Sequence, residues 1–268
     1  MDISDTRKCN LFNLESVANY LNAPLSELNS YYFELLDDQE FLDSVNSQIS
    51  EVRRKHGFSK GIFGMQTISS IDWFAFERVL IYVLIRYFKP IRILETGVYY
   101  GGNSAFALLA IYRNKCGILT SIDFPDSQIR KIGASEIRHS LVGDSELYDS
   151  SLTPGFMIPP YLLNSWEIFY GDSLQIIPKL TDKFDFYIHD SDHSMPFLSR
   201  ELTSASEILS DKALLLVDDI DWSNAFYQFC AIRRLFPVLL TDNGKDNLRV
   251  RTGVIWLDHP NNMNDIFT

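Results

Sequence analysis

Residues 93–105 read I-L-E-T-G-V-Y-Y-G-G-N-S-A. A short apolar run leads into a turn that contains Gly97, Gly101 and Gly102, and a segment with helical spacing follows. A strand, a turn and a helix in this order are the unit from which open α/β sheets are built. Ligands of such sheets bind at the carboxyl ends of the strands, where the strand order reverses. The turn is therefore the first candidate for a binding site.

The same alternation continues along the chain and predicts the fold. After a first strand at 91–94, further strand-like runs occupy 118–122, 166–170, 184–188, 213–217, 238–241 and 250–257. Helical stretches are expected at 71–88, 103–113, 173–180, 197–209 and 223–235. An Asn-Gly pair in the last connection is typical of a hairpin. We expect an α/β protein with a doubly wound, Rossmann-like sheet of seven mostly parallel strands and an antiparallel edge.

Two regions lie outside this alternation. Residues 1–70 are largely helical in spacing and are interpreted as an N-terminal extension to a main domain at 71–268. This extension could form a homo-oligomer contact or cover a site. Residues 126–165 contain no clear strand, and their apolar end, 155–161, resembles a lid. An ordered surface excursion packed on the sheet is an equally good interpretation.

The composition narrows the classes of partner. The 268 residues carry a formal net charge of −11, which disfavours binding to nucleic acid or to anionic membranes. Three widely spaced cysteines argue against a disulfide framework. The acidic residues 1–5 do not resemble a secretory leader, and the apolar run 79–85 is too short to span a bilayer. We expect a cytoplasmic protein.

The glycine turn favours one kind of ligand. Tyr99 stands where a dinucleotide fingerprint needs its second glycine, and no lysine follows Gly102 as a phosphate-binding loop requires. The turn instead suits an adenosine ligand with a carboxylate, and Glu95 could bind an ammonium group. S-adenosylmethionine has both features. The alternative is a tight connection without a ligand.

Acids at later strand ends support this interpretation. Asp123 ends the second strand, where a carboxylate can accept both ribose hydroxyls. Asp172 and Ser173 follow the third strand, within reach of an adenine amino group. Each of these alone is more often a helix cap, but together they favour a nucleoside site.

The sequence resembles the class I S-adenosylmethionine-dependent O-methyltransferases, over roughly residues 70–258. It is similar to the metal-dependent catechol type and to the branch of macrocin-type sugar O-methyltransferases. The E-x-G-x-Y-x-G-x-S turn of the catechol enzymes is matched except at its last position, where Asn103 precedes Ser104. Residues 171–178 match the adenine-binding turn. The matching and expected cofactor-binding residues are Glu95, Thr96, Gly97, Tyr99, Gly101, Asn103, Ser104, Asp123, Asp172, Ser173 and Asp190.

Three aspartates are expected near the transferable methyl group. Asp190 ends the fourth strand, and Asp218 and Asp219 end the fifth. Both neighbours can face one ion only if the chain is already turning there. Three carboxylates form a hard-oxygen site that suits Mg²⁺, Ca²⁺ or Mn²⁺. The resemblance implies that such a cation, Mg²⁺ foremost, chelates two neighbouring substrate oxygens.

The resemblance makes His193 the catalytic base, because this residue lies three positions after the first metal aspartate. A capping turn with His193 exposed is the alternative. His189 is expected to pack within its strand, Asp192 to face solvent or substrate, and Trp222 to wall the pocket or join the core. The expected acceptor is a hydroxylated small molecule, a sugar or glycoside with neighbouring hydroxyls, or else a catechol. A metal-dependent phosphohydrolase and a non-catalytic binding protein are the rivals.

Overall fold

The computed structural model describes residues 3–56, 76–124, 154–243 and 248–262. The strands are β1 (Arg92–Thr96), β2 (Ile118–Asp123), β3 (Trp166–Tyr170), β4 (Phe184–His189), β5 (Leu209–Val217), β6 (Val238–Asn243) and β7 (Leu248–Trp256). The helices are α1 (Ile3–Leu21), α2 (Leu25–Leu36), α3 (Gln39–His56), α4 (Phe76–Phe88), α5 (Gly102–Asn114), α8 (Ser173–Ile176), α9 (Met195–Ser206) and α10 (Ala225–Arg233). Two 3-10 helices are η4 (Pro160–Ser165) and η5 (Ile177–Lys179).

The strands form one sheet in the order β3-β2-β1-β4-β5-β7-β6. β1 to β5 are parallel, whereas β7 runs antiparallel to both β5 and β6. The predicted doubly wound, mostly parallel sheet with an antiparallel edge is confirmed. The strand order reverses between β1 and β4, so the turn after β1 lies at the switch point where ligands of such sheets bind.

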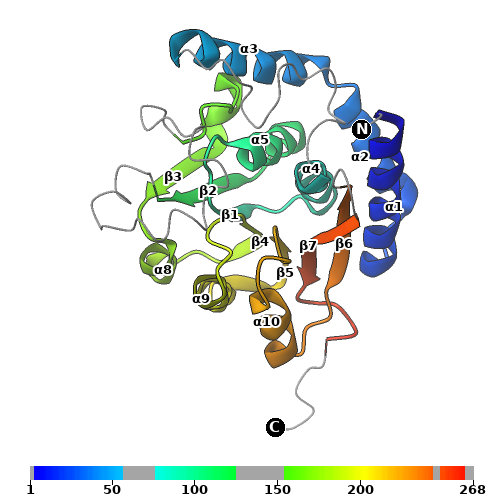
Figure 1. Cartoon of the computed structure of the whole chain (residues 1–268), viewed down its shortest axis with the longest axis vertical. Helices are drawn as coiled ribbons and strands as arrows, with labels where there is room; N and C mark the ends of the chain where they lie inside the picture. The colour runs from blue at the N-terminus through cyan, green and yellow to red at the C-terminus, as the bar shows by residue number, and fades with distance from the viewer. Residues whose placement is uncertain (1–2, 57–75, 125–153, 244–247, 263–268) are drawn as a thin grey trace.

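Helices cover both faces of the sheet (Figure 1). α4 and α5 lie on one face, and α8, α9 and α10 lie on the other. Two separate hydrophobic clusters correspond to these faces. The central strands are buried on both sides, as in the wholly buried run 213–217 of β5, which explains why they read as continuous apolar stretches.

The three N-terminal helices pack outside α4, α5 and the β6 edge (Figure 1). Asn13 of α1 donates to the backbone oxygen of Thr241 in β6 at 2.7 Å. Glu34 of α2 pairs with Arg86 of α4 at 2.8 Å, and Phe41 of α3 packs edge-on against Phe106 of α5. These helices therefore share the core cluster of α4 and α5. None of the described helices is long and apolar enough to cross a membrane.

Part of the predicted lid is docked on the turn after β1. The backbone N–H groups of Gly155 and Met157 donate to the carbonyl oxygens of Tyr99 and Tyr100, both at 2.9 Å. Met157 and Ile158 are buried. The end of the segment is thus ordered packing on the sheet, while residues 125–153 lie outside the described part of the chain.

Candidate active site

The carboxyl ends of the five parallel strands, β1 to β5, lie side by side at one end of the sheet. Backbone hydrogen bonds run from Asp190 to Thr96 at 2.9 Å, and from Asp218 to His189 at 3.0 Å. The backbone N–H of Gly171, after β3, donates to the Asp123 carbonyl at 2.9 Å. The strand-end acids that the sequence singled out therefore lie along one line.

The backbone of the glycine turn has a conformation that side chains at Gly97 and Gly101 would prevent. Gly97 has φ +84°, and a Cβ atom there would lie 2.0 Å from the carbonyl oxygen of Asp190. At Gly101, with φ +86°, a Cβ atom would lie 2.7 Å from the Cα of Gly155. The turn thus needs glycine at both positions, because the left-handed backbone and the close approach both exclude a side chain. Tyr99 also has a positive φ, +49°.

Asp123 fixes this turn from the neighbouring strand. Its Oδ2 atom accepts the backbone N–H groups of Val98 and Tyr99, both at 2.8 Å. Burial raises the pKa of Asp123, although these two N–H groups stabilise its charged form. Within the described part of the chain, no group donates to Oδ1. The expected ribose contact stays a prediction that this second oxygen could fulfil.

Glu95 is wholly buried on the α5 side of the sheet. Its Oε2 atom accepts from the hydroxyls of Ser104, at 2.7 Å, and Ser121, at 2.6 Å. Its Oε1 atom is also buried, and it has no hydrogen-bond partner among the described residues. Burial raises the pKa of Glu95 to about 7, against the pull of the two hydroxyls. No basic side chain of the described residues pairs with this carboxyl group.

A second buried carboxylate, Glu201 of α9, was not singled out from the sequence. It accepts from His189 Nδ1 at 2.5 Å, Ser191 Oγ at 2.8 Å, and Thr96 Oγ1 and Tyr187 OH at 3.1 Å. Its other oxygen accepts from the Ser173 hydroxyl. The signal was present, because Glu201 falls on the buried stripe Leu198–Leu202–Ala205 of its helix, where a charge needs partners.

Several predicted cofactor-binding side chains are held by other protein groups. The hydroxyls of Thr96 and Ser173 donate to Glu201, and that of Ser104 donates to Glu95. Asp172 caps α8 by accepting the backbone N–H of Leu174 at 2.9 Å. These contacts position the strand ends and the turns. Binding of a cofactor by these residues stays a prediction.

Asn103 joins the turn to the end of β4. Its amide Nδ2 donates to Asp190 Oδ2 at 2.9 Å, and its Oδ1 accepts from Arg78 Nε at 3.3 Å. Asn103 is buried at the start of α5. The residue that replaces serine in the resembled motif therefore orients the first predicted metal ligand.

His193 lies beside the acids rather than out in solvent. Its Nε2 atom is 3.7 Å from Asp190 Oδ1 and 3.9 Å from Asp219 Oδ2, and the residue is only 8% exposed. Burial opposes its protonation, but Asp190 and then Asp219 outweigh burial and raise the pKa of His193. Its Nδ1 atom is buried without a partner in the described chain. Nε2 is the nitrogen that faces the strand ends.

The neighbours of His193 fall into two groups. The half-exposed ring of Trp222 lies 5.6 Å from the His193 ring, a placement that suits a pocket wall. His189, buried in β4, bonds to Glu201. Asp192 accepts the backbone N–H of Ser194 at 2.8 Å, just before α9, and so acts as a turn residue.

Asp218 and Asp219 both face the side chain of Arg251 in β7. Arg251 lies 2.5 Å from Asp219 Oδ1 through Nη2 and 3.7 Å from Asp218 Oδ2. Burial opposes the charged form of Arg251, but the two aspartates outweigh it and raise its pKa further. Burial and the nearby carboxylate of Glu77 raise the pKa of Asp218 well above its usual range.

This arrangement does not fit the predicted divalent cation. Among the described residues, no three side chains of the ligand types form a group that could hold a metal ion. The oxygens of Asp218 and Asp219 are directed at a guanidinium instead. We therefore derive no chemistry through a metal, and metal binding by Asp190, Asp218 and Asp219 stays a prediction from the sequence.

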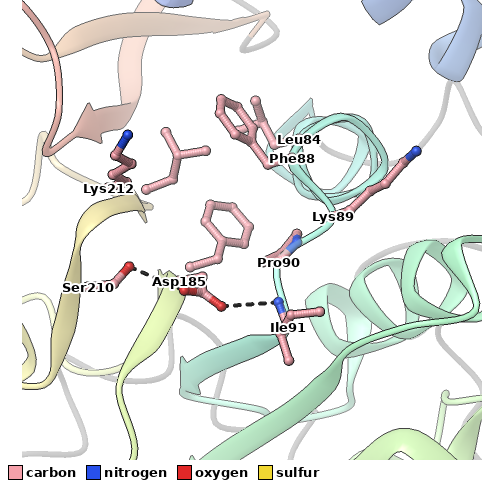
Figure 2. A pocket seen from close by; sticks show the side chains of 10 residues that line it. Leu84, Phe88, Lys89, Pro90, Ile91, Asp185, Ser210 and Lys212 are labelled. Atoms are coloured by element: carbon pink, nitrogen blue, oxygen red, sulfur yellow. Dashed lines mark hydrogen bonds between the residues drawn. The ribbon is translucent and has the colours of Figure 1, made fainter.

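A pocket of about 310 Å³ lies at the opposite end of the sheet, where the parallel strands begin. Figure 2 shows it between the end of α4 and the starts of β4 and β5. Its carboxylate, Asp185, is satisfied by Ser210 and by the backbone N–H of Ile91. This pocket is remote from the strand ends that carry the candidate residues.

A family profile described as "Methyltransferase domain" matches residues 94–220, from within β1 to just beyond β5. This region of the chain is therefore similar to methyltransferase domains. The glycine turn and the strand-end acids all lie within the matched region. No curated protein matches the chain in sequence.

Solved structures show the same fold. An O-methyltransferase from Bacillus cereus in complex with SAH is 14% identical with a TM-score of 0.51, covering 85% of this chain and 99% of that one. The O-methyltransferase TomG from Streptomyces achromogenes, in complex with SAM, is 17% identical with a TM-score of 0.50, covering 83% and 92%. A methyltransferase from Geobacter sulfurreducens is 16% identical with a TM-score of 0.50, covering 86% and 97%. The chain thus has the class I methyltransferase fold.

Proposed function

We propose that this protein is a methyltransferase that uses S-adenosylmethionine to methylate a hydroxyl of a small molecule, foremost a sugar or glycoside with neighbouring hydroxyls. The observation that carries the proposal is the turn after β1. It lies at the switch point of the sheet, two of its three glycines press against the segments at 190 and 155, and a buried carboxyl oxygen of Glu95 beside it has no partner among the described residues. A cationic ammonium group would satisfy that oxygen.

The remaining contacts follow from the same geometry. Asp123 Oδ1 accepts the ribose hydroxyls while Oδ2 holds the turn. The region after β3, where Asp172 caps α8, takes the adenine. In this position, S-adenosylmethionine lies across the carboxyl ends of the strands. Its sulfonium group is then directed toward the ends of β1 and β4.

His193 then serves as the base. The acceptor hydroxyl approaches Nε2, which faces Asp190 and Asp219. The new C–O bond forms as the C–S bond breaks, the bonding electrons of that bond stay on sulfur, and the hydroxyl proton passes to Nε2. Asp190 and Asp219 stabilise the imidazolium that results. Alignment of the two reactants can supply roughly 7–11 kcal/mol.

Calorimetric titration with S-adenosylmethionine and S-adenosylhomocysteine tests the cofactor assignment. We expect micromolar binding of both, and saturable methyl transfer from labelled cofactor to members of a panel of sugars, glycosides and catechols. Absence of binding would refute the proposal. Transfer to catechols alone would reject the sugar assignment but keep the reaction class.

His193→Ala is the matching test of mechanism. We expect turnover to fall by about 10²–10⁴-fold, the range typical of a lost general base. Binding of S-adenosylhomocysteine should change little, because His193 is not part of the proposed cofactor contacts. Wild-type turnover in the variant would remove His193 as the base.

The rival assignments have less support. A phosphohydrolase requires acids that are free to hold metal ions, and two of the three are paired with Arg251. A non-catalytic binding protein would not need His193 beside the acids. Cytoplasmic location, a possible homo-oligomer, and the lack of nucleic-acid and membrane partners stay predictions from the sequence.

A further inference from the structure

Two aspartates at the end of β5 and one arginine of β7 form a single unit. β7 lies beside β5 in antiparallel register, with Val217 opposite Gly253. The backbone N–H of Ile220 donates to the carbonyl oxygen of Arg251 at 2.9 Å. The turn that carries Asp218 and Asp219 is therefore attached to the arginine that it faces.

The backbone directs both carboxylates to the same cation. Asp219 has φ +49°, so the strand has ended and the chain is turning there. Asp219 Oδ1 accepts from Arg251 Nε at 2.7 Å, and Asp218 accepts from the Thr252 hydroxyl at 3.5 Å. The side chain of Arg251 is mostly buried, so solvent screens these charges weakly.

A divalent cation would compete with this guanidinium for the same oxygens. Mg²⁺ binds carboxylate oxygens at about 2.0–2.1 Å in near-octahedral geometry. Asp219 Oδ1 already receives two guanidinium contacts, and a second cation beside Arg251 would be repelled. Binding would require the arginine to leave its two carboxylate partners.

We propose that Arg251 takes the place of a divalent cation at this strand end, and that the enzyme works without one. The charge replacement stands on geometry alone, while its consequence for turnover rests on the proposed methyl transfer. A guanidinium is always charged near neutral pH, so the acid pair stays balanced without an exchangeable ion. Arg251 is a positioning residue that keeps Asp219 beside His193 Nε2.

Binding of Mn²⁺, followed by electron paramagnetic resonance and by thermal unfolding, tests the replacement without any need for turnover. We expect the wild-type protein to bind no stoichiometric Mn²⁺ at micromolar concentrations and to keep its Tm in EDTA. Arg251→Gln frees the acid pair, so it should bind one Mn²⁺ and gain roughly 2–4 °C in Tm from it. Stoichiometric micromolar binding by the wild type, with loss of Tm in EDTA, would overturn the proposal.

Two further variants distinguish loss of the positive charge at position 251 from a general loss of folding. Arg249→Gln removes a positive charge from the same strand at an exposed position that pairs with Asp221 instead, so it should behave as wild type. Arg251→Lys keeps the charge at the site and should also exclude Mn²⁺, which keeps the test valid if Arg251→Gln does not fold. Mn²⁺ binding by Arg251→Lys at wild-type stability would overturn the proposal.

The metal dependence of turnover gives a separate test. Wild-type methyl transfer should be the same in EDTA and in Mg²⁺, whereas a loss of about tenfold or more in EDTA would reject metal independence. If no transfer or cofactor binding occurs at all, the proposed function fails, and the Mn²⁺ result still decides whether Arg251 replaces the cation.

Discussion

Two carboxyl groups on opposite sides of β1 are equally buried, and yet the pKa of one is raised and the pKa of the other is lowered. Glu95 lies on the side covered by α5, and its successor Thr96 reaches Glu201 on the side covered by α9. Successive residues of a strand face opposite sides of a sheet, so one strand contacts both groups. Burial raises the pKa of Glu95 to about 7. Burial acts on Glu201 in the same direction, but His189 and then Ser173 and Ser191 outweigh it and lower the pKa of Glu201.

The attraction of His189 for Glu201 and the larger number of donors account for the difference in pKa. Glu201 receives five hydrogen bonds, which stabilise its charge and tie the ends of β1 and β4 and the start of α8 to α9. Glu95 receives two, and its other oxygen has no partner in the described part of the chain. Burial alone therefore does not decide whether an acid is charged. Glu201 is complete as structure, whereas Glu95 is completed by a cationic ligand under the proposed function.

Replacing Glu201 should have the largest effect on stability. Glu201→Gln keeps the shape but removes the charge that four donors share at Oε2 and that pairs with His189, and it places an amide N–H₂ group against the Ser173 hydroxyl. We expect a loss of about 3–5 kcal/mol in the free energy of unfolding, measured with denaturant. Binding of S-adenosylhomocysteine should also weaken, because the strand ends lose their common anchor.

Glu207→Gln is the matched control for that variant. Glu207 lies at the end of the same helix with a largely exposed side chain, and its change should stay within about 0.5 kcal/mol. A similarly small effect of Glu201→Gln would mean that the five contacts do not hold the strand ends.

Glu95→Gln should have the next largest effect, and one that depends on pH. The folded state raises the pKa of Glu95 from 4.5 to about 7 and thus favours its protonated form. Its contribution to stability is complete below pH 4.5 and is lost as the pH rises to about 7, by at most about 3 kcal/mol. Glutamine does not titrate, so the variant should lose this part of the pH dependence in unfolding measured from pH 4.5 to 8.

Stabilisation by a bound ligand gives a second test of Glu95. The ammonium group of S-adenosylhomocysteine should favour the ionised Glu95, so this ligand should stabilise the wild type more strongly than Glu95→Gln at pH 8. An unchanged pH dependence in the variant would show that Glu95 does not titrate in this range. Equal stabilisation of both proteins by the ligand would separate Glu95 from the ammonium contact.

The sheet could be predicted because its strands are short apolar runs between clear turns. The runs at 118–122 and 166–170 match β2 and β3 to within one residue. β5 begins earlier than the predicted 213, since its first residues are partly polar and exposed. The spacing of glycines in the turn after β1 was also informative, because packing against residues 155 and 190 excludes side chains there.

The partners of charged residues could not be predicted in the same way. Periodicity places Glu201 on the buried side of its helix, but it does not reveal the five donors from other elements. Arg251 stands in the closing strand, thirty-two positions after Asp219, and only the pairing of β5 with β7 brings the two together. The sequence therefore indicated acids that face one cation, but not that the chain supplies this cation itself.

The smallest expected effect comes from removing one donor from each carboxyl group. Ser104→Ala leaves Glu95 with the Ser121 hydroxyl alone, which should cost about 1–2 kcal/mol and raise the pKa of Glu95 further. Ser191→Ala leaves Glu201 with four donors, so its cost should be about 0.5–1 kcal/mol. Denaturant unfolding of both variants at pH 5 and pH 8 measures the contrast. The Ser104→Ala cost should be larger at pH 8, where Glu95 ionises, and the Ser191→Ala cost should not change with pH. Equal, pH-independent costs would contradict the view that the hydrogen-bond donors help to set the charge of these two acids.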